Sequence, residues 1–226
     1  MKANLVKYTY FIVLTADILI RLLEFNEFDK FLKPLLMPLM LYYLIERAAG
    51  KIYRSHLLLA LALIVSWIGD ILLLYKEQVF LMGGIGVFLI TQSTYMIIFR
   101  SNITVSLRQS IFDNKVATGI ITLFLVAMLI SAIYFIDFPL MILVAIYAAG
   151  VAGATLTAYL QNRNIPGYLL TTVGMSCFLI SDTLIGVNLF VAPVPLAPLL
   201  IMGTYGIAQY LITEGVVLNS ESDTGI

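Results

Sequence analysis

The sequence predicts an all-helical membrane protein, a bundle of eight transmembrane helices joined by short loops. Of its 226 residues, 61% are hydrophobic and only 12% are charged, and the mean hydropathy is +1.00. A soluble domain is about half apolar and about a quarter charged, so this chain has too few polar residues to cover its surface in water. The apolar residues also fall in blocks of roughly 20, the length that crosses a bilayer. This composition excludes a cytosolic enzyme, a nucleic-acid-binding protein and a disordered chain.

Hydropathy and loop signals place all eight spans in a single transmembrane domain covering residues 1–226. The expected spans are 7–24, 32–49, 56–75, 80–99, 115–135, 138–160, 165–190 and 196–218. Eight blocks of this length leave only short loops, so the sequence has no room for a second, soluble domain.

The first four spans follow one another through short turns. The first contains Asp17 and Arg21 and has no small-residue cleavage site, so we expect a retained helix rather than a signal peptide. The third opens at His56, which we expect at the membrane surface. The fourth has glycines near its start but no preceding strand, which favours close helix packing over a phosphate-binding loop. These glycines are Gly83, Gly84 and Gly86.

The last four spans are bounded by stronger loop signals. The longest polar loop, Arg100 to Asn114, precedes the fifth span, and an Asn-Ile-Pro-Gly segment ends at Gly167 before the seventh. Small residues at four-residue spacing mark the sixth as a packing helix. They are Ala145, Ala149, Gly153 and Thr157, with Gly150, Ala154 and Ala158 alongside. Three prolines, Pro193, Pro195 and Pro198, interrupt the chain at the start of the eighth.

The distribution of basic residues predicts the orientation. The amino end and the loops after the second, fourth and sixth spans hold nine Lys and Arg residues, whereas the opposite side holds four. Because cytoplasmic loops are enriched in these residues, we expect both termini in the cytoplasm, as an even number of spans requires.

Two carboxylates at membrane depth are the strongest candidates for function. Asp70 in the third span and Asp182 in the seventh have apolar residues on both sides, and such a charge costs at least about 2.5 kcal/mol at the centre of a span. Both helices run outward and place the aspartate at a similar depth. Two poorly solvated carboxylates that meet there share a proton, leaving one acid and one base. The alternative is that each is neutralised by its own structural partner.

Other polar residues are expected near the same level. Asp17 and Arg21 are one helical turn apart and predict an intrahelical ion pair. Lys33 opens the second span on the outer side, where it either binds a phosphate or extends to the membrane surface. Two pairs of polar residues share helix faces and are expected to line the same cavity, although ordinary core packing is an alternative for the tyrosines. They are Gln92 with Tyr95 and Tyr205 with Gln209. The single cysteine and the lack of a Cys–His cluster predict no metal site.

At these positions the sequence resembles the YhhN-like family, the bacterial relatives of the eukaryotic lysoplasmalogenases. The resemblance runs in the same order from the second span to the eighth. The similar elements are Lys33-Pro34-Leu35 with Pro38, Gly69-Asp70, the stretch from Gly84 to Tyr95, Ser181-Asp182 with Phe190, Tyr205, and Gln209-Tyr210-Leu211-Ile212.

The resemblance implies a cofactor-free enzyme of eight helices in the bacterial cytoplasmic membrane. Such an enzyme cleaves the vinyl-ether bond of lysoplasmalogens to give a fatty aldehyde and glycerophosphoethanolamine or glycerophosphocholine. Where the family is expected to have a histidine three residues before Tyr95, this chain has Gln92. Because an amide cannot shuttle a proton near pH 7, this departure predicts an altered activity or another lipid ether or ester as substrate.

This chemistry suits the polar residues found above. Protonation of the alkene carbon gives an oxocarbenium ion, which water captures, and the hemiacetal collapses to aldehyde and alcohol. The reaction needs one protonated acid and one carboxylate, and we assign these two roles to Asp70 and Asp182 without deciding which has which. Gln92, Tyr95, Tyr205 and Gln209 are expected to orient water and the glycerol oxygens. Arg21 and Lys33 are expected to hold the phosphate of a lysophospholipid, with Asp17 in support.

Two other classes of function fit the same residues. A small proton-coupled transporter also uses buried aspartates, and predicts broken helices and a cavity that opens to either face. A non-catalytic lipid-binding membrane protein predicts that both aspartates are dispensable. The sequence does not determine the oligomeric state.

Overall fold

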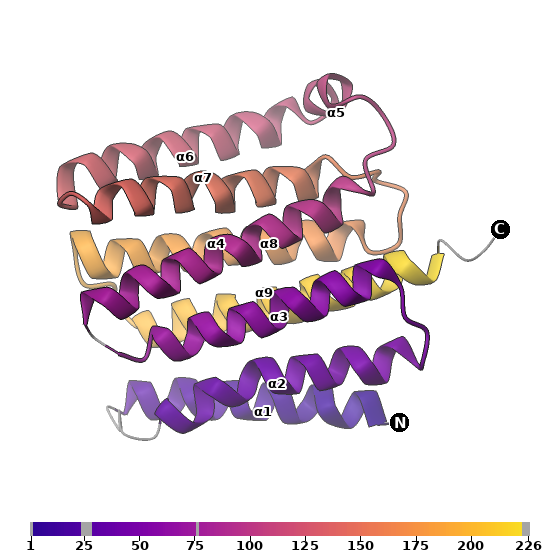
Figure 1. The fold of residues 1–226 in the computed structure, drawn as a ribbon, viewed down its shortest axis with the longest axis horizontal. Helices are drawn as coiled ribbons and strands as arrows, with labels where there is room; N and C mark the ends of the chain where they lie inside the picture. Colours follow the sequence, from indigo (N-terminus) through magenta and orange to yellow (C-terminus); the bar gives the residue numbers. More distant parts are fainter. Residues whose placement is uncertain (1, 24–28, 76, 223–226) are drawn as a thin grey trace.

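The computed structural model describes residues 2–23, 29–75 and 77–222, and these residues form helices without any strand. Eight of the helices are long and lie side by side along the long axis of the molecule (Figure 1). Their bounds are α1 Lys2–Leu22, α2 Asp29–Ala48, α3 Arg54–Leu72, α4 Gln78–Arg100, α6 Lys115–Phe135, α7 Leu140–Tyr159, α8 Tyr168–Gly186 and α9 Ala197–Ser222. A short helix, α5 Leu107–Asp113, precedes α6, and a π-helical turn, η1 Val187–Val191, extends α8. The predicted all-helical class is therefore confirmed.

Five of the described helices are long and apolar enough to cross a membrane: α3, α4, α6, α7, and α8 together with η1. The helices α1, α2 and α9 are equally long but carry more charged or polar residues. The chain is therefore an integral membrane protein, and each of the eight predicted spans overlaps one long helix.

The loop predicted from Arg100 to Asn114 is wrong in part, because residues 107–113 form α5. Ser106 begins this helix, and its hydroxyl accepts a hydrogen bond from the backbone N–H of Gln109 at 3.3 Å. Serine is a favoured N-cap because it satisfies a backbone donor that the first turn leaves unpaired. A capped helix of seven residues, about two turns, is too short to show in a hydropathy profile.

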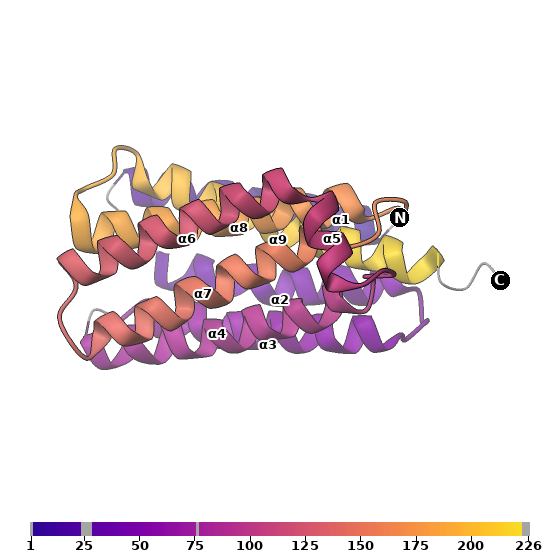
Figure 2. The same ribbon diagram turned by 90° about the horizontal axis from the view of Figure 1, so that it is seen from above.

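Helix α9 is the central element of the bundle. It packs most extensively against α8 and also contacts α1, α2 and α3, while α4 joins α3 to α7, and α6 lies outermost against α7. Figure 2 shows the same bundle from above, with α1 beginning and α9 ending at the same end of the molecule. Because α9 contacts elements from both halves of the chain, residues far apart in the sequence meet around it.

Small residues allow α7 to approach α4 closely. A Cβ atom on Gly150 would lie 2.6 Å from Leu89 Cδ1, and Gly150, Ala154 and Ala158 are buried. Ala149, which the four-residue spacing predicts to be part of the packing stripe, is exposed. The buried stripe is therefore the one that begins at Gly150.

A proline in α2 ties this helix to α3. Pro38 has no backbone N–H, so the carbonyl of Pro34 one turn earlier loses its helical partner. Trp67 of α3 donates its indole N–H to this carbonyl, with Nε1 2.8 Å from the oxygen. The bond fixes the end of α2 that carries Lys33 against the turn of α3 that carries Asp70.

Candidate functional site

Both aspartates line a single cavity of about 110 Å³ between the helices. Its polar lining residues are Lys33, Asp70, Tyr147, Ser181, Asp182 and Tyr205. The remaining lining residues are apolar and come from α3, α4, α6, α7, α8, η1 and α9. They are Leu73, Leu81, Ile85, Phe88, Met128, Val144, Ile185, Gly186, Leu189, Phe190, Ile201 and Met202. The cavity is therefore a mostly apolar chamber with a few convergent polar groups, which is the usual composition of a small-molecule site.

Asp70 has a partner on each carboxylate oxygen. The hydroxyl of Tyr205 donates to Oδ2 at 2.7 Å, and the ammonium nitrogen of Lys33 lies 3.2 Å from Oδ1. The side chain is 2% exposed. A buried carboxylate with a cation and a hydrogen-bond donor is compensated for the loss of water.

The residue before Asp70 allows its helix to approach α4. A Cβ atom on Gly69 would lie 2.7 Å from Cε2 of Phe88, so a larger residue would force the ring away. The Phe88 ring is in edge contact with Tyr205, whose ring centroid is 6.3 Å away. Gly69 thus contributes to the placement of both Asp70 and its tyrosine partner.

Asp182 has a different environment. The hydroxyl of Tyr147 donates to its Oδ2 at 2.5 Å, and no cation among the described residues lies within ion-pair distance of it. The preceding residue, Ser181, donates to the backbone carbonyl of Ile201 at 3.0 Å and so fixes α8 against α9. Both carboxylates line the same cavity. The cavity therefore holds two acidic side chains, of which only one has a cationic partner.

Three residues expected in this cavity lie elsewhere. Tyr95 donates its hydroxyl to Oε1 of Gln209 at 2.8 Å, and both side chains are fully buried outside the cavity lining. Gln92 is also fully buried outside the lining, and its side-chain amide lies beside the Tyr147 hydroxyl without forming a hydrogen bond of regular geometry with any described residue. The ring of Phe178 contacts the rings of both Tyr95 and Tyr205. Phe178 therefore contacts both a residue of the cavity lining and a residue outside it, an arrangement that sequence spacing does not show.

Arg21 lies in a neighbouring hollow. Its Nε is 2.8 Å from Oδ2 of Asp17, the intrahelical ion pair that the spacing predicts. The hollow, of about 520 Å³, is also lined by Lys33 and Asn188 and shares several lining residues with the aspartate cavity. A second neighbouring hollow, of about 220 Å³, is mostly apolar and lies among α6, α7, α8 and η1. It shares Met128 and Phe190 with the aspartate cavity. A cationic space and an apolar space therefore flank the two carboxylates.

The model of the YhhN family matches residues 28–216, which is most of the chain. The chain belongs to the YhhN family. No curated protein and no solved structure matched the chain.

The YhhN family match covers both aspartates and every other polar residue that lines the cavity. Asp17 and Arg21 precede the matched range, so the family comparison does not bear on them. Among the described residues, no three His, Cys, Asp or Glu side chains are grouped so that they would hold a metal ion.

Sequence reasoning missed Tyr147 in this YhhN family protein. It lies on α7 among alanines and aliphatic residues, where a tyrosine is ordinary in a membrane helix. One signal was available: Tyr147 is three residues before Gly150, on the same face as the small residues that bring α7 against α4. A hydroxyl on that face has to find a partner inside the bundle.

Proposed function

We propose that this YhhN family protein is a membrane-embedded lipid hydrolase that cleaves the vinyl-ether bond of a lysoplasmalogen. In this proposal all eight long helices cross the bacterial cytoplasmic membrane with both termini in the cytoplasm. The observation that carries the proposal is the pair of differently partnered carboxylates in one largely apolar cavity, Asp70 with Lys33 and Asp182 with Tyr147. Vinyl-ether hydrolysis needs one acid and one carboxylate, and needs them in a site that limits water.

The partners suggest a role for each aspartate. Asp70 has the ammonium group of Lys33 beside it and serves as the carboxylate that stabilises the oxocarbenium ion. Asp182, which has only a phenol as a polar partner, serves as the proton donor. Tyr147 occupies Oδ2, which leaves Oδ1 to carry the proton.

The reaction then has three steps. Asp182 gives its proton to the alkene carbon that is not bonded to oxygen, and positive charge develops on the ether oxygen and its neighbouring carbon. Water adds to that carbon and returns a proton to an aspartate carboxylate. The hemiacetal hydroxyl then loses its proton as the bond from carbon to the glycerol oxygen breaks, and the glycerol oxygen takes up a proton, which releases a fatty aldehyde and a glycerophospho-alcohol.

The two flanking hollows suit an amphipathic substrate. Arg21 and Lys33 provide positive charge for the phosphate on one side. The apolar hollow among α6, α7 and α8 accepts the alkenyl chain on the other side. A lysophospholipid that extends from the Arg21 hollow through the aspartate cavity into the apolar hollow has its ether bond beside the two aspartates.

The test is an assay of aldehyde release by the purified protein. It compares a lysoplasmalogen with an acyl-lysolipid of the same head group and chain length. We expect aldehyde from the lysoplasmalogen alone, and a loss of at least about a hundredfold in rate for Asp70→Asn and for Asp182→Asn. Asp137→Asn, which changes an exposed aspartate outside the cavity lining, is the matched control and should retain the wild-type rate.

The same assay separates the competing functions. A proton-coupled transporter would move lipid or a small solute without releasing aldehyde. A non-catalytic lipid-binding protein would bind the substrate equally well with both aspartates replaced. A wild-type protein that releases no aldehyde from lysoplasmalogen would end the hydrolase proposal.

A further inference from the structure

A second polar hollow lies at the opposite end of α3 from the aspartate cavity. It has a volume of about 490 Å³ and is formed by the start of α3, the end of α4 and the last turns of α9. Figure 1 shows α3 and α4 drawing apart toward this end of the bundle, with α9 beside them. Arg54 in this hollow and Asp70 are sixteen residues apart on one helix, which is about 24 Å. The hollow is therefore separate from the candidate active site.

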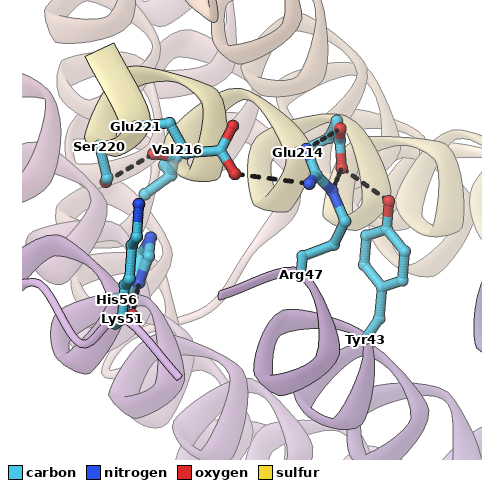
Figure 3. Close-up of polar contacts among 8 residues, drawn as sticks. All are labelled: Tyr43, Arg47, Lys51, His56, Glu214, Val216, Ser220 and Glu221. Carbon is cyan, nitrogen blue, oxygen red and sulfur yellow. Dashed lines mark hydrogen bonds and ion pairs between the residues drawn. The ribbon is translucent and has the colours of Figure 1, made fainter. Parts of the chain in front are cut away.

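Two arginines on the rim of the hollow have no acidic partner. The side chains of Arg54 and Arg100 form no ion pair or hydrogen bond with any residue that the structure describes. Acidic side chains of α9 at this end already have a basic partner. Arg47 lies 2.8 Å from Glu214 and 3.5 Å from Glu221, and Tyr43 donates to Glu214 at 2.6 Å (Figure 3). The guanidinium groups of Arg54 and Arg100 are therefore available to bind an anion from outside the protein.

The lining combines hydrogen-bonding groups with an apolar floor. Ser55 and Ser220 contact each other at 2.6 Å between their hydroxyl oxygens, and Ser101 and Asn102 follow Arg100 on the rim. The floor is made by Leu58, Ile97, Ile98 and Val216. Ile97 is half exposed, so the apolar floor continues onto the outer face of the bundle. A small soluble anion would gain nothing from contact with such an apolar floor, whereas an amphiphile would bury its hydrocarbon chain against it.

We propose that this hollow binds the phosphate head group of an anionic membrane phospholipid, with the start of its acyl chains against the apolar floor. This site goes beyond the hydrolase function and does not depend on it. Guanidinium groups bind phosphate oxygens by charge-assisted, bidentate hydrogen bonds. The arginines lie on the side that the positive-inside rule assigns to the cytoplasm, where anionic lipids give the membrane surface a negative potential.

The test counts bound lipid on the intact protein. Delipidated protein in detergent is titrated separately with phosphatidylglycerol, phosphatidylcholine and inorganic phosphate, and bound molecules are measured by native mass spectrometry. We expect phosphatidylglycerol to bind about tenfold more tightly than phosphatidylcholine, and the Arg54→Gln/Arg100→Gln double variant to lose this preference. Arg108→Gln removes an exposed arginine of α5 outside the hollow and should keep it.

Three results would overturn the proposal. The first is equal binding of the two lipids by the wild-type protein. The second is a double variant that retains the wild-type preference. The third is inorganic phosphate binding at concentrations similar to those of phosphatidylglycerol, which would assign the hollow to a soluble anion instead. None of these readouts requires catalysis, so failure of the lipid site and failure of the hydrolase proposal are distinguishable.

Discussion

At the scale of single residues, the partners of the two aspartates carry the chemistry. A charged residue alone in an apolar run stands out in a sequence, and Asp70 and Asp182 were both found in this way. Their partners stand out unequally. Lys33 and Tyr205, the partners of Asp70, are both predicted from the sequence, whereas Tyr147 is one of 13 tyrosines and only the packing of α7 against the cavity distinguishes it.

Tyr147 is expected to position Asp182 rather than to touch the substrate. Tyr147→Phe removes the 2.5 Å hydrogen bond to Oδ2, so the carboxyl group is free to rotate away from the reacting carbon. We expect kcat for aldehyde release to fall about tenfold or more with little change in KM. The matched control is Tyr159→Phe on the same helix, which removes a 3.0 Å contact with Ser176 outside the cavity lining. Equal rates for the two variants would refute the positioning role.

Gln92 and Gln209, which are both fully buried, provide a test of stability. Gln209 accepts a hydrogen bond from Tyr95, whereas the Gln92 amide forms no hydrogen bond of regular geometry with any described residue. Replacing Gln209 with leucine leaves the Tyr95 hydroxyl buried without an acceptor and should cost about 1–3 kcal/mol. Gln92→Leu loses no hydrogen bond and should change the free energy of unfolding by less than about 0.5 kcal/mol. Denaturant unfolding in detergent measures both, and a larger loss for Gln92→Leu would show that its amide has a partner.

At the scale of helices, hydropathy predicts where each element lies but not which face is buried. The eight predicted ranges each overlap a long helix. A block of about 20 apolar residues in a membrane forms a helix because the helix satisfies all its backbone hydrogen bonds internally. The buried stripe of α7 was displaced by one residue, from Ala149 to Gly150, because several small residues lie side by side in that sequence. The ring contacts of Phe178 with Tyr95 and Tyr205 depend on three helices meeting, which the sequence pattern of a single helix does not encode.

The contact between α8 and α9 is expected to be sensitive to a single methyl group. A Cβ atom on Gly167 would lie 1.9 Å from the backbone oxygen of Gly215, and a backbone atom cannot move aside as a side chain can. We expect Gly167→Ala to destabilise the protein by about 3 kcal/mol. Gly203→Ala on α9, where nothing lies within 4 Å of the new atom, should be neutral or slightly stabilising. Thermal unfolding of the two variants checks this, and similar melting temperatures would contradict the close approach of the helices.

At the scale of the whole molecule, the aspartate cavity and the arginine-lined hollow lie toward opposite ends of the bundle. The aspartate cavity and the arginine-lined hollow share α3, α4 and α9 as walls but face different ends of them. An uneven distribution of basic residues fixes how a membrane protein is inserted. The uneven distribution of basic residues that orients the chain therefore also determines which leaflet of the membrane lies next to each cavity. The sequence count of nine against four basic residues predicts that the aspartate cavity lies toward the outer leaflet.

This orientation is open to a direct test, because the chain has one cysteine. In a Cys177→Ala background, new cysteines replace Asp137, an exposed residue between α6 and α7, or Asn164, an exposed residue between α7 and α8. The two positions lie at opposite ends of α7, so they face opposite sides of the membrane if that helix crosses it. We expect a membrane-impermeant maleimide to label Asp137→Cys in intact spheroplasts, and to label Asn164→Cys only after the membrane is permeabilised. The reverse pattern would place the aspartates near the cytoplasmic leaflet, and the lysolipid substrate would then have to enter from inside the cell.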